Sequence, residues 1–238
     1  MRAYLDVLKN RDFALFWSGL TVSQLGDGLS WVALVWFVYE LTDSPAAVGL
    51  FLLVYTAPTL LGGLVAGVLL DRFDKRRVMV VDNVLRALAL ALIPLLHWLG
   101  ALELWHLYAV AFVFGALMMV TLAGGPALVP SLVKPEQLNT ANALESVSWS
   151  LGDIVGRAAA GLLVGLIGAP NVLVVDVFTY LVLVFNLLLM RPPAAAPELD
   201  AGHGPVKARV RLRDGAAFIV RQPVVFAITV AFVVLNLG

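Results

Sequence analysis

Six long apolar stretches, separated by short polar segments, dominate the hydrophobic pattern of this chain. Each has about 20 residues or more, enough for a helix rising 1.5 Å per residue to cross a hydrocarbon core of about 30 Å. Backbone N–H and C=O groups in lipid must be paired within the segment, so such spans are predicted to be helices. The pattern predicts an all-α membrane protein, a six-helix transmembrane bundle, with spans at approximately residues 13–39, 47–70, 78–99, 105–130, 140–168 and 171–190.

The same pattern divides the chain into three parts. Residues 1–190 are predicted to form the six-helix bundle. Residues 191–222 begin with a Pro- and Ala-rich run and are predicted to be a linker, in which the basic segment from Val206 either lies on the membrane as a helix or is a solvated linker. Residues 223–238 are predicted to start a seventh transmembrane helix that the chain end truncates, so we expect a fragment of a longer protein.

Basic residues lie in alternate connections of this topology. The N-terminal segment and the second, fourth and sixth connections hold fourteen of the sixteen Lys and Arg residues, and the first, third and fifth connections hold none. Loops rich in Lys and Arg stay in the cytoplasm during insertion. We therefore expect a multi-pass protein of the cell inner membrane with its N-terminus in the cytoplasm.

Composition excludes several functional classes. Hydrophobic residues make up 61% of the chain and charged residues 13%, against about 45–50% and about 25% in soluble domains. Without Cys, disulfides and thiol catalysis are excluded. The phosphate-binding loop Gly-x-x-x-x-Gly-Lys-Ser/Thr, the metalloprotease pattern His-Glu-x-x-His and the hydrolase pattern Gly-x-Ser-x-Gly are all missing. We expect no enzymatic activity, no cofactor or metal and no nucleic-acid partner.

The connection between the second and third spans carries a recognisable motif. Residues 67–77 read GVLLDRFDKRR, which resembles the major facilitator superfamily signature Gly-x-Leu-x-Asp-Arg-x-Gly-Arg-Arg. Gly67, Asp71, Arg72 and Arg76 match it, whereas Asp74 replaces the second glycine. Together with segments 82–86, 134–144 and 212–215, the chain resembles the efflux branch that includes enterobactin exporters and macrolide-efflux permeases.

This resemblance implies the N-terminal half of a twelve-helix secondary carrier, with helices 1–3 and 4–6 as an inverted three-plus-three repeat and one half rocking against the other. We expect proton-coupled export of a siderophore-like or drug-like small molecule. An importer or symporter of the same fold, and a non-transporting half-unit acting as a scaffold or dimer, remain alternatives. The expected partners are a small-molecule substrate, membrane lipid, protons and a missing C-terminal half.

Ionisable residues inside membrane spans are costly and usually face a cavity or a partner. Asp27 lies between two glycines near the middle of the first span, with no basic residue one helical turn away. It is the first candidate for carrying the coupling proton, and a neutral, hydrogen-bonded helix contact is the alternative. Asp153 and Arg157, four residues apart in the fifth span, are further coupling candidates. Their pair can line a central cavity, where the guanidinium can hold an anionic group.

Two further groups of residues are predicted from position. Asp82 and Arg86 share a face of the third span, and we expect them to join Asp71 and Arg72 in a cytoplasmic gate or to be a self-neutralising packing pair. Amphipathic side chains on the spans that line the cavity in this family are expected to contact substrate or to pack in the core. They are Gln24, Trp31, Tyr55 and Trp149.

Overall fold

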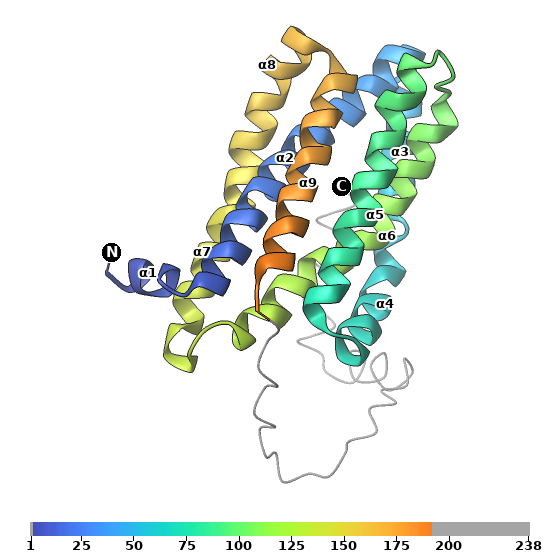
Figure 1. The fold of residues 1–238 in the computed structure, drawn as a ribbon. Helices are drawn as coiled ribbons and strands as arrows, with labels where there is room; N and C mark the ends of the chain where they lie inside the picture. The colour runs from blue at the N-terminus through green and yellow to red at the C-terminus, as the bar shows by residue number, and fades with distance from the viewer. Residues whose placement is uncertain (1, 192–238) are drawn as a thin grey trace, which may run out of the picture. The chain divides into compact units, whose positions relative to one another are not determined.

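The computed structural model describes residues 2–191, apart from the side chains of Arg2, Leu60, Leu61 and Leu64. Within this part of the chain the secondary structure is helical, without strands, as the apolar pattern predicted (Figure 1). The predicted linker, beyond Arg191, and the predicted seventh helix at 223–238 lie outside the described residues.

A short helix at the N-terminus precedes the predicted spans. In chain order the helices are α1 (Arg2–Leu8), α2 (Arg11–Thr42), α3 (Pro45–Thr56), α4 (Thr59–Arg72), α5 (Lys75–Trp98), α6 (Leu104–Leu128), two 3₁₀ turns (Val129–Ser131 and Pro135–Gln137), α7 (Leu138–Leu151), a π-helical turn (Gly152–Gly156), α8 (Arg157–Ile167) and α9 (Ala169–Leu189). Four helical stretches are long and apolar enough to cross a membrane, namely Lys75–Trp98, Leu104–Ser131, Pro135–Ile167 and Ala169–Leu189. Together with α2 and the α3–α4 pair, they account for the six predicted spans.

The second span is not the single continuous helix that the apolar pattern predicted. Helix α3 ends at Thr56 and α4 begins at Thr59, with Ala57 and Pro58 between them. Proline lacks a backbone N–H, and its ring clashes with the carbonyl of the preceding turn, so it interrupts the helical hydrogen bonds. Because Ala57 and Pro58 keep right-handed helical dihedrals, the span continues in the same general direction as a bent helix.

The fifth span also departs from α-helical geometry near its middle, in the π-helical turn. Gly152 and Gly156 of this turn lie against the backbone of α2: a Cβ atom on Gly152 would collide with the carbonyl oxygen of Gln24, and one on Gly156 with that of Leu25. Gly28 of α2 faces the carbonyl of Gly152 in the same way. Only glycine allows the two backbones to approach this closely.

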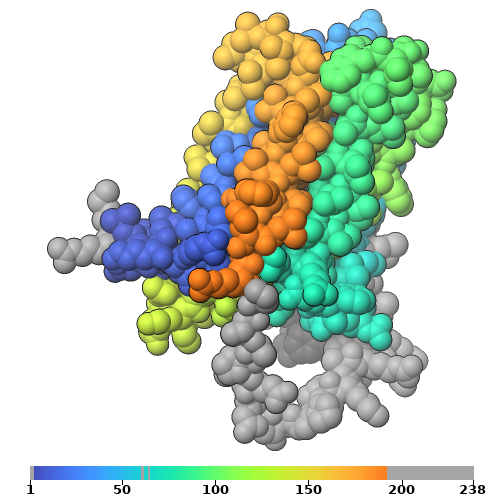
Figure 2. Space-filling model, viewed as in Figure 1, coloured from blue at the N-terminus to red at the C-terminus, as the bar shows by residue number. Residues whose placement is uncertain are grey.

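The contacts between helices are the same for spans 1–3 as for spans 4–6. The first span (α2) packs against the sixth (α9) and the fifth (α7, the π turn and α8), while the fourth (α6) packs against the third (α5) and the second (α3 and α4). The third and sixth spans also pack together, and Figure 2 shows the side chains of α9 between those of α2 and α5. Exchanging spans 1–3 with spans 4–6 leaves this set of contacts unchanged, as expected for an inverted three-plus-three repeat.

Two apolar core regions occupy the two ends of the bundle. On α2, Phe13 and Phe16 belong to one region and Ala33 and Phe37 to the other. The buried polar side chains of α2, which are Ser23, Gln24 and Ser30, fall in the stretch between these two pairs. Polar groups are thus concentrated about halfway along the helices.

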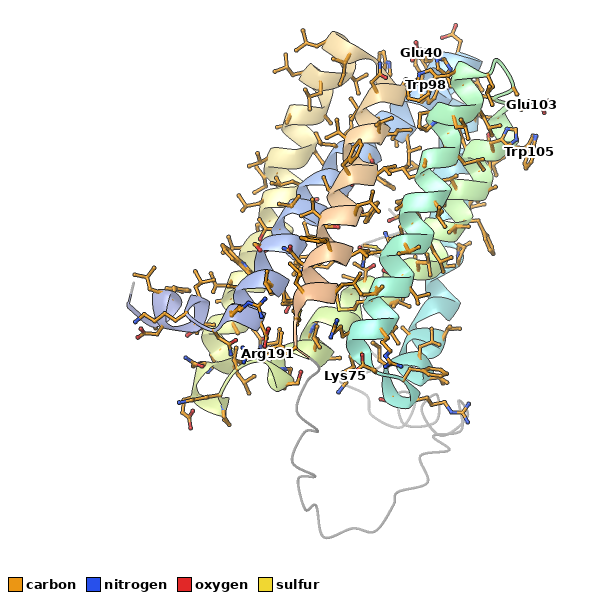
Figure 3. All side chains as sticks on the ribbon, viewed as in Figure 1. Glu40, Lys75, Trp98, Glu103, Trp105 and Arg191 are labelled. Atoms are coloured by element: carbon orange, nitrogen blue, oxygen red, sulfur yellow. The ribbon has the colours of Figure 1, made fainter. Side chains whose placement is uncertain are left out.

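Charge separates the two ends of the bundle. Figure 3 shows Glu40, Trp98, Glu103 and Trp105 at one end and Lys75 and Arg191 at the other. Large apolar side chains are exposed along the flanks between these ends, including Leu88, Phe112, Leu162, Phe178 and Phe185. An exposed apolar surface of this extent is unfavourable in water but favourable in contact with lipid. The bundle is an all-α membrane protein.

Candidate functional site

A cavity lies halfway along the bundle, where the two apolar core regions leave space. Its volume is about 620 Å³, including space that is open to the exterior. Its wall is built from all of the first five spans. The lining residues are Gln24, Asp27, Gly28, Ser30, Trp31, Leu34, Tyr55, Arg86, Phe114, Met118, Trp149, Gly152, Asp153 and Arg157.

All four residues predicted to line a cavity are found in this wall. Trp31 lies edge-on to Tyr55, with ring centroids 4.8 Å apart, so α2 and α3 present a joined aromatic surface. Trp149 contributes a third aromatic side chain from α7, and Gln24 contributes an almost buried amide from α2. The wall therefore offers flat apolar surfaces interrupted by polar groups.

Arg86 is the most deeply buried charge of the cavity wall, with 2% of its side chain exposed. Its Nε atom lies 3.4 Å from Oδ2 of Asp82, so the pairing predicted from the four-residue spacing is confirmed. Its guanidinium also lies 5.1 Å from the ring centre of Phe114. A buried guanidinium needs such partners, because an unpaired charge is expensive to remove from water.

Asp27 has a basic partner that the sequence did not reveal. No basic residue neighbours it on α2, but Nη1 of Arg86 on α5 lies 3.8 Å from its Oδ1 atom. The hydroxyl of Tyr180 on α9 donates a hydrogen bond to the same oxygen. Asp27 thus has partners on two other helices, which its neighbours along α2 do not reveal. We call Asp27, Asp82, Arg86 and Tyr180 the polar cluster.

Asp153 and Arg157 form a second ion pair in the cavity wall, with 2.6 Å between Oδ1 and Nη2. Both side chains are more exposed than those of the polar cluster, with 61% of Asp153 and 50% of Arg157 exposed. The guanidinium of Arg157 also lies 6.0 Å from the ring centre of Trp31. Because solvent reaches it, this arginine is free to exchange partners.

The motif loop lies at the basic end of the bundle. Gly67, Asp71 and Arg72 are exposed near the end of α4. Asp74, in place of the signature's second glycine, caps α5 by accepting a hydrogen bond from the backbone N–H of Arg77 at 2.9 Å. Where the signature has a glycine that allows a tight turn, this chain has an aspartate that caps the next helix.

The structure places the predicted gate residues in two locations. Arg76, next to the loop, donates to the carbonyl of Leu188 at 2.9 Å and so joins α5 to the end of α9. Arg86 instead faces the central cavity, away from the exposed Asp71 and Arg72. Asp82 connects the two locations, because a surface groove that includes loop residue Asp74 also reaches Asp82.

The structure reveals three polar residues of the interior that the sequence analysis did not assign to a site. Tyr180 and Asp176 are fully buried on α9, and Glu145 of α7 is buried against Gly125, where a Cβ atom would strike its carboxyl oxygen. The side chain of Asp176 is 0% exposed. The available signal was the presence of polar residues inside the apolar spans 140–168 and 171–190.

The comparisons with known proteins agree with this architecture. The sequence model of the transmembrane secretion effector family, a major facilitator family, matches residues 3–232. The chain belongs to this family. It therefore belongs to a family of membrane transporters of the efflux type.

Curated relatives of this chain include named efflux proteins. The multidrug efflux pump Tap of Mycolicibacterium fortuitum is 26% identical over 84% of this chain and 50% of its own length. Macrolide efflux protein A of Streptococcus pyogenes is 24% identical over 79% of this chain and 47% of its own length. An uncharacterised transporter of Sinorhizobium fredii is 32% identical over 62% of this chain and 36% of its own length. The chain spans about half the length, or less, of these relatives.

Proposed function

We propose that this chain is the N-terminal half of a secondary active exporter that moves a drug-like or siderophore-like molecule out of the cytoplasm in exchange for protons. The central cavity carries the proposal: it combines aromatic surfaces with two ion pairs at the depth where carriers of this kind bind substrate. Relatives named as multidrug and macrolide efflux proteins support export as the direction.

The cavity wall favours a partly apolar organic substrate with a polar or charged group. Trp31, Tyr55 and Trp149 supply flat surfaces for rings or for a macrocycle. Arg157 is half exposed, and among the described residues its ion pair is with Asp153 of the same span, so it is available to a carboxylate or another anionic group. Such a wall selects by shape and charge rather than by a fixed set of hydrogen bonds, which suits a broad substrate range.

Asp27 is the group in the cavity wall that is best placed to connect substrate with protons. A quarter of its side chain is exposed to the cavity, and its carboxyl also contacts Arg86 and Tyr180. A proton on Asp27 removes one of the two carboxylates that hold Arg86, so protonation changes the charge that the substrate meets. Asp153 can act on Arg157 in the same way, because the two side chains form an ion pair.

Transport requires a second bundle that faces this cavity. We propose that residues 1–190 rock against a C-terminal half encoded downstream, with the motif loop of Gly67, Asp71, Arg72 and Arg76 at the cytoplasmic face of the inner membrane. This orientation follows from the basic residues of that end. The N-terminus then lies in the cytoplasm.

The first prediction concerns coupling. In inverted vesicles containing this chain together with its downstream reading frame, an imposed proton gradient is expected to drive uptake of a macrolide or of a lipophilic dye. Asp27→Asn should abolish the response to the gradient, because the amide cannot exchange a proton. Asp6→Asn, which removes only an exposed ion pair with Lys9, is the control and should behave as the parent protein.

Two results would contradict this proposal. Unchanged gradient-driven flux in Asp27→Asn would remove Asp27 from the coupling mechanism. Gradient-driven flux by the 238-residue chain alone would show that no second bundle is needed.

A further inference from the structure

Asp176 is a buried carboxyl group that the proposed transport cycle has not used. It lies on α9, packed against α2, and its side chain is 0% exposed. Its Oδ1 atom accepts a hydrogen bond from Thr179 at 2.6 Å, whereas its Oδ2 atom is buried without a hydrogen-bond partner among the described residues. It is not part of the cavity wall, so cavity water does not solvate it.

The packing of α2 leaves a space that fits this carboxyl group. Gly26 faces α9, and a Cβ atom at this position would collide with both Oδ1 of Asp176 and the hydroxyl oxygen of Thr179. The side chain of Asp176 therefore fills the place that a larger residue at position 26 would occupy. Ser30, one turn further along α2, brings a buried hydroxyl close to the same carboxyl.

The charges around Asp176 do not balance if every acid is ionised. Asp27 lies near it on α2, Arg86 on α5 and Tyr180 on its own helix. The one guanidinium of this group is shared by Asp82 at 3.4 Å and Asp27 at 3.8 Å. Within residues 2–191 no basic side chain forms an ion pair with Asp176.

The hydroxyl groups around Asp176 cannot correct this imbalance. Thr179 and Ser30 can hydrogen-bond to a carboxylate, but they do not neutralise its charge. A carboxylate that is fully removed from water without a cation costs many kcal/mol, and such a group takes up a proton instead. The described residues also hold no cluster of acids or histidines that would suit a metal ion.

We infer that Asp176 is a proton-binding site, neutral in the conformation described, and that the seam between α2 and α9 must open for its proton to leave. Tyr180, one helical turn along α9 from Asp176, donates its hydroxyl to Asp27. Two carboxyl groups that can bind a proton thus lie near each other, Asp27 at the cavity and Asp176 inside the helix packing. Asp176 holds the proton, while Asp27 remains paired with Arg86.

Infrared spectroscopy of the full chain in lipid nanodiscs tests the protonation directly. At neutral pH the parent protein is expected to show the carbonyl stretch of a protonated carboxyl group. Asp176→Asn should remove this band, while Asp27→Asn and Asp82→Asn should keep it. Asp176→Glu should keep the band at a shifted frequency, which provides a second reading if the amide variant folds poorly. A parent spectrum without the band, or an unchanged band in Asp176→Asn, would overturn the inference.

The role of this proton in transport rests on the proposed function and needs its own measurement. In vesicles containing the complete reading frame, Asp176→Asn should lose gradient-driven flux but keep substrate exchange that needs no gradient, because the amide mimics the proton-loaded site. Equal gradient-driven flux in the variant and the parent would overturn this role. If the parent itself ignores the gradient, the proposed function fails, and the infrared band still decides the protonation of Asp176.

Discussion

Two aspartate–arginine pairs with the same four-residue spacing have opposite environments in this bundle. Asp82 and Arg86 are each about 2% exposed, whereas Asp153 and Arg157 are at least half exposed. Removing one partner of a buried pair leaves an uncompensated charge, which costs about 3–5 kcal/mol. An exposed pair contributes about 0–1 kcal/mol. The same sequence pattern therefore has a structural role at one site and leaves the arginine free for ligands at the other.

This contrast gives the second prediction. Arg86→Leu should lower the free energy of unfolding in mild detergent by about 3–5 kcal/mol, because Asp82 and Asp27 lose their shared cation. Arg157→Leu, the matched control, should lower it by at most about 1 kcal/mol. The measurement is thermal or denaturant unfolding of both variants beside the parent protein. Equal losses would show that the environments of the two pairs do not differ as described.

At the residue scale, the sequence predicted contacts along a helix better than contacts between helices. The spacing of Asp82 and Arg86 defines their pairing, because α-helical geometry brings residues four apart together. The approach of Arg86 to Asp27 depends on how α2 and α5 both pack against α9, which no local pattern encodes. The burial of Asp176 also depends on packing between helices, since it comes from α2 rather than from the position of Asp176 along α9.

At the scale of elements, the π-helical turn determines how closely the fifth span approaches the first. Gly152 and Gly156 bring the turn against the carbonyls of Gln24 and Leu25. A π turn shifts the register of the residues that follow it, so Asp153 and Arg157 reach the cavity from the same segment that contacts α2. The positions of the helices could be predicted from hydrophobicity, but this register shift could not. The interruption of the second span at Pro58 was not predicted, although the proline itself is the signal for it.

The third prediction tests this seam with two glycines of the same span. Gly152→Ala should destabilise the bundle by about 1–3 kcal/mol, because the added methyl group collides with the backbone of α2. Gly161→Ala should leave stability unchanged or raise it by up to about 1 kcal/mol, because nothing lies within 4 Å of its added Cβ atom. Thermal unfolding of the two variants makes the comparison. A tolerated Gly152→Ala would contradict the close packing.

At the scale of the whole molecule, the separation of charge between the two ends should set the orientation in the membrane. Lys75 and Arg191 mark one end, and Glu40 and Glu103 mark the other. The alternation of basic connections predicted this separation from sequence, because a span reverses the chain direction each time. How this bundle would face the proposed second bundle could not be predicted, since such contacts would involve residues of another segment.

The fourth prediction uses the absence of cysteine from the chain, which makes single-cysteine labelling unambiguous. Glu40→Cys in intact cells should react with a maleimide that cannot cross membranes. Lys75→Cys should react only after the membrane is permeabilised, because the proposed orientation places this end of the bundle in the cytoplasm. The reverse pattern of labelling would show the opposite orientation, and with it the proposed position of the motif loop would be wrong.

The point at which the chain leaves the bundle is held from two directions. The backbone N–H of Arg191 donates to Asp12 at the start of α2, at 3.2 Å, and Arg76 at the start of α5 holds the carbonyl of Leu188. A displacement of the residues that follow would therefore act on α2 and α5, which carry Asp27 and Arg86. Movement of a downstream segment would thus be transmitted along α2 and α5 to the ion pair of Asp27 and Arg86 in the middle of the bundle.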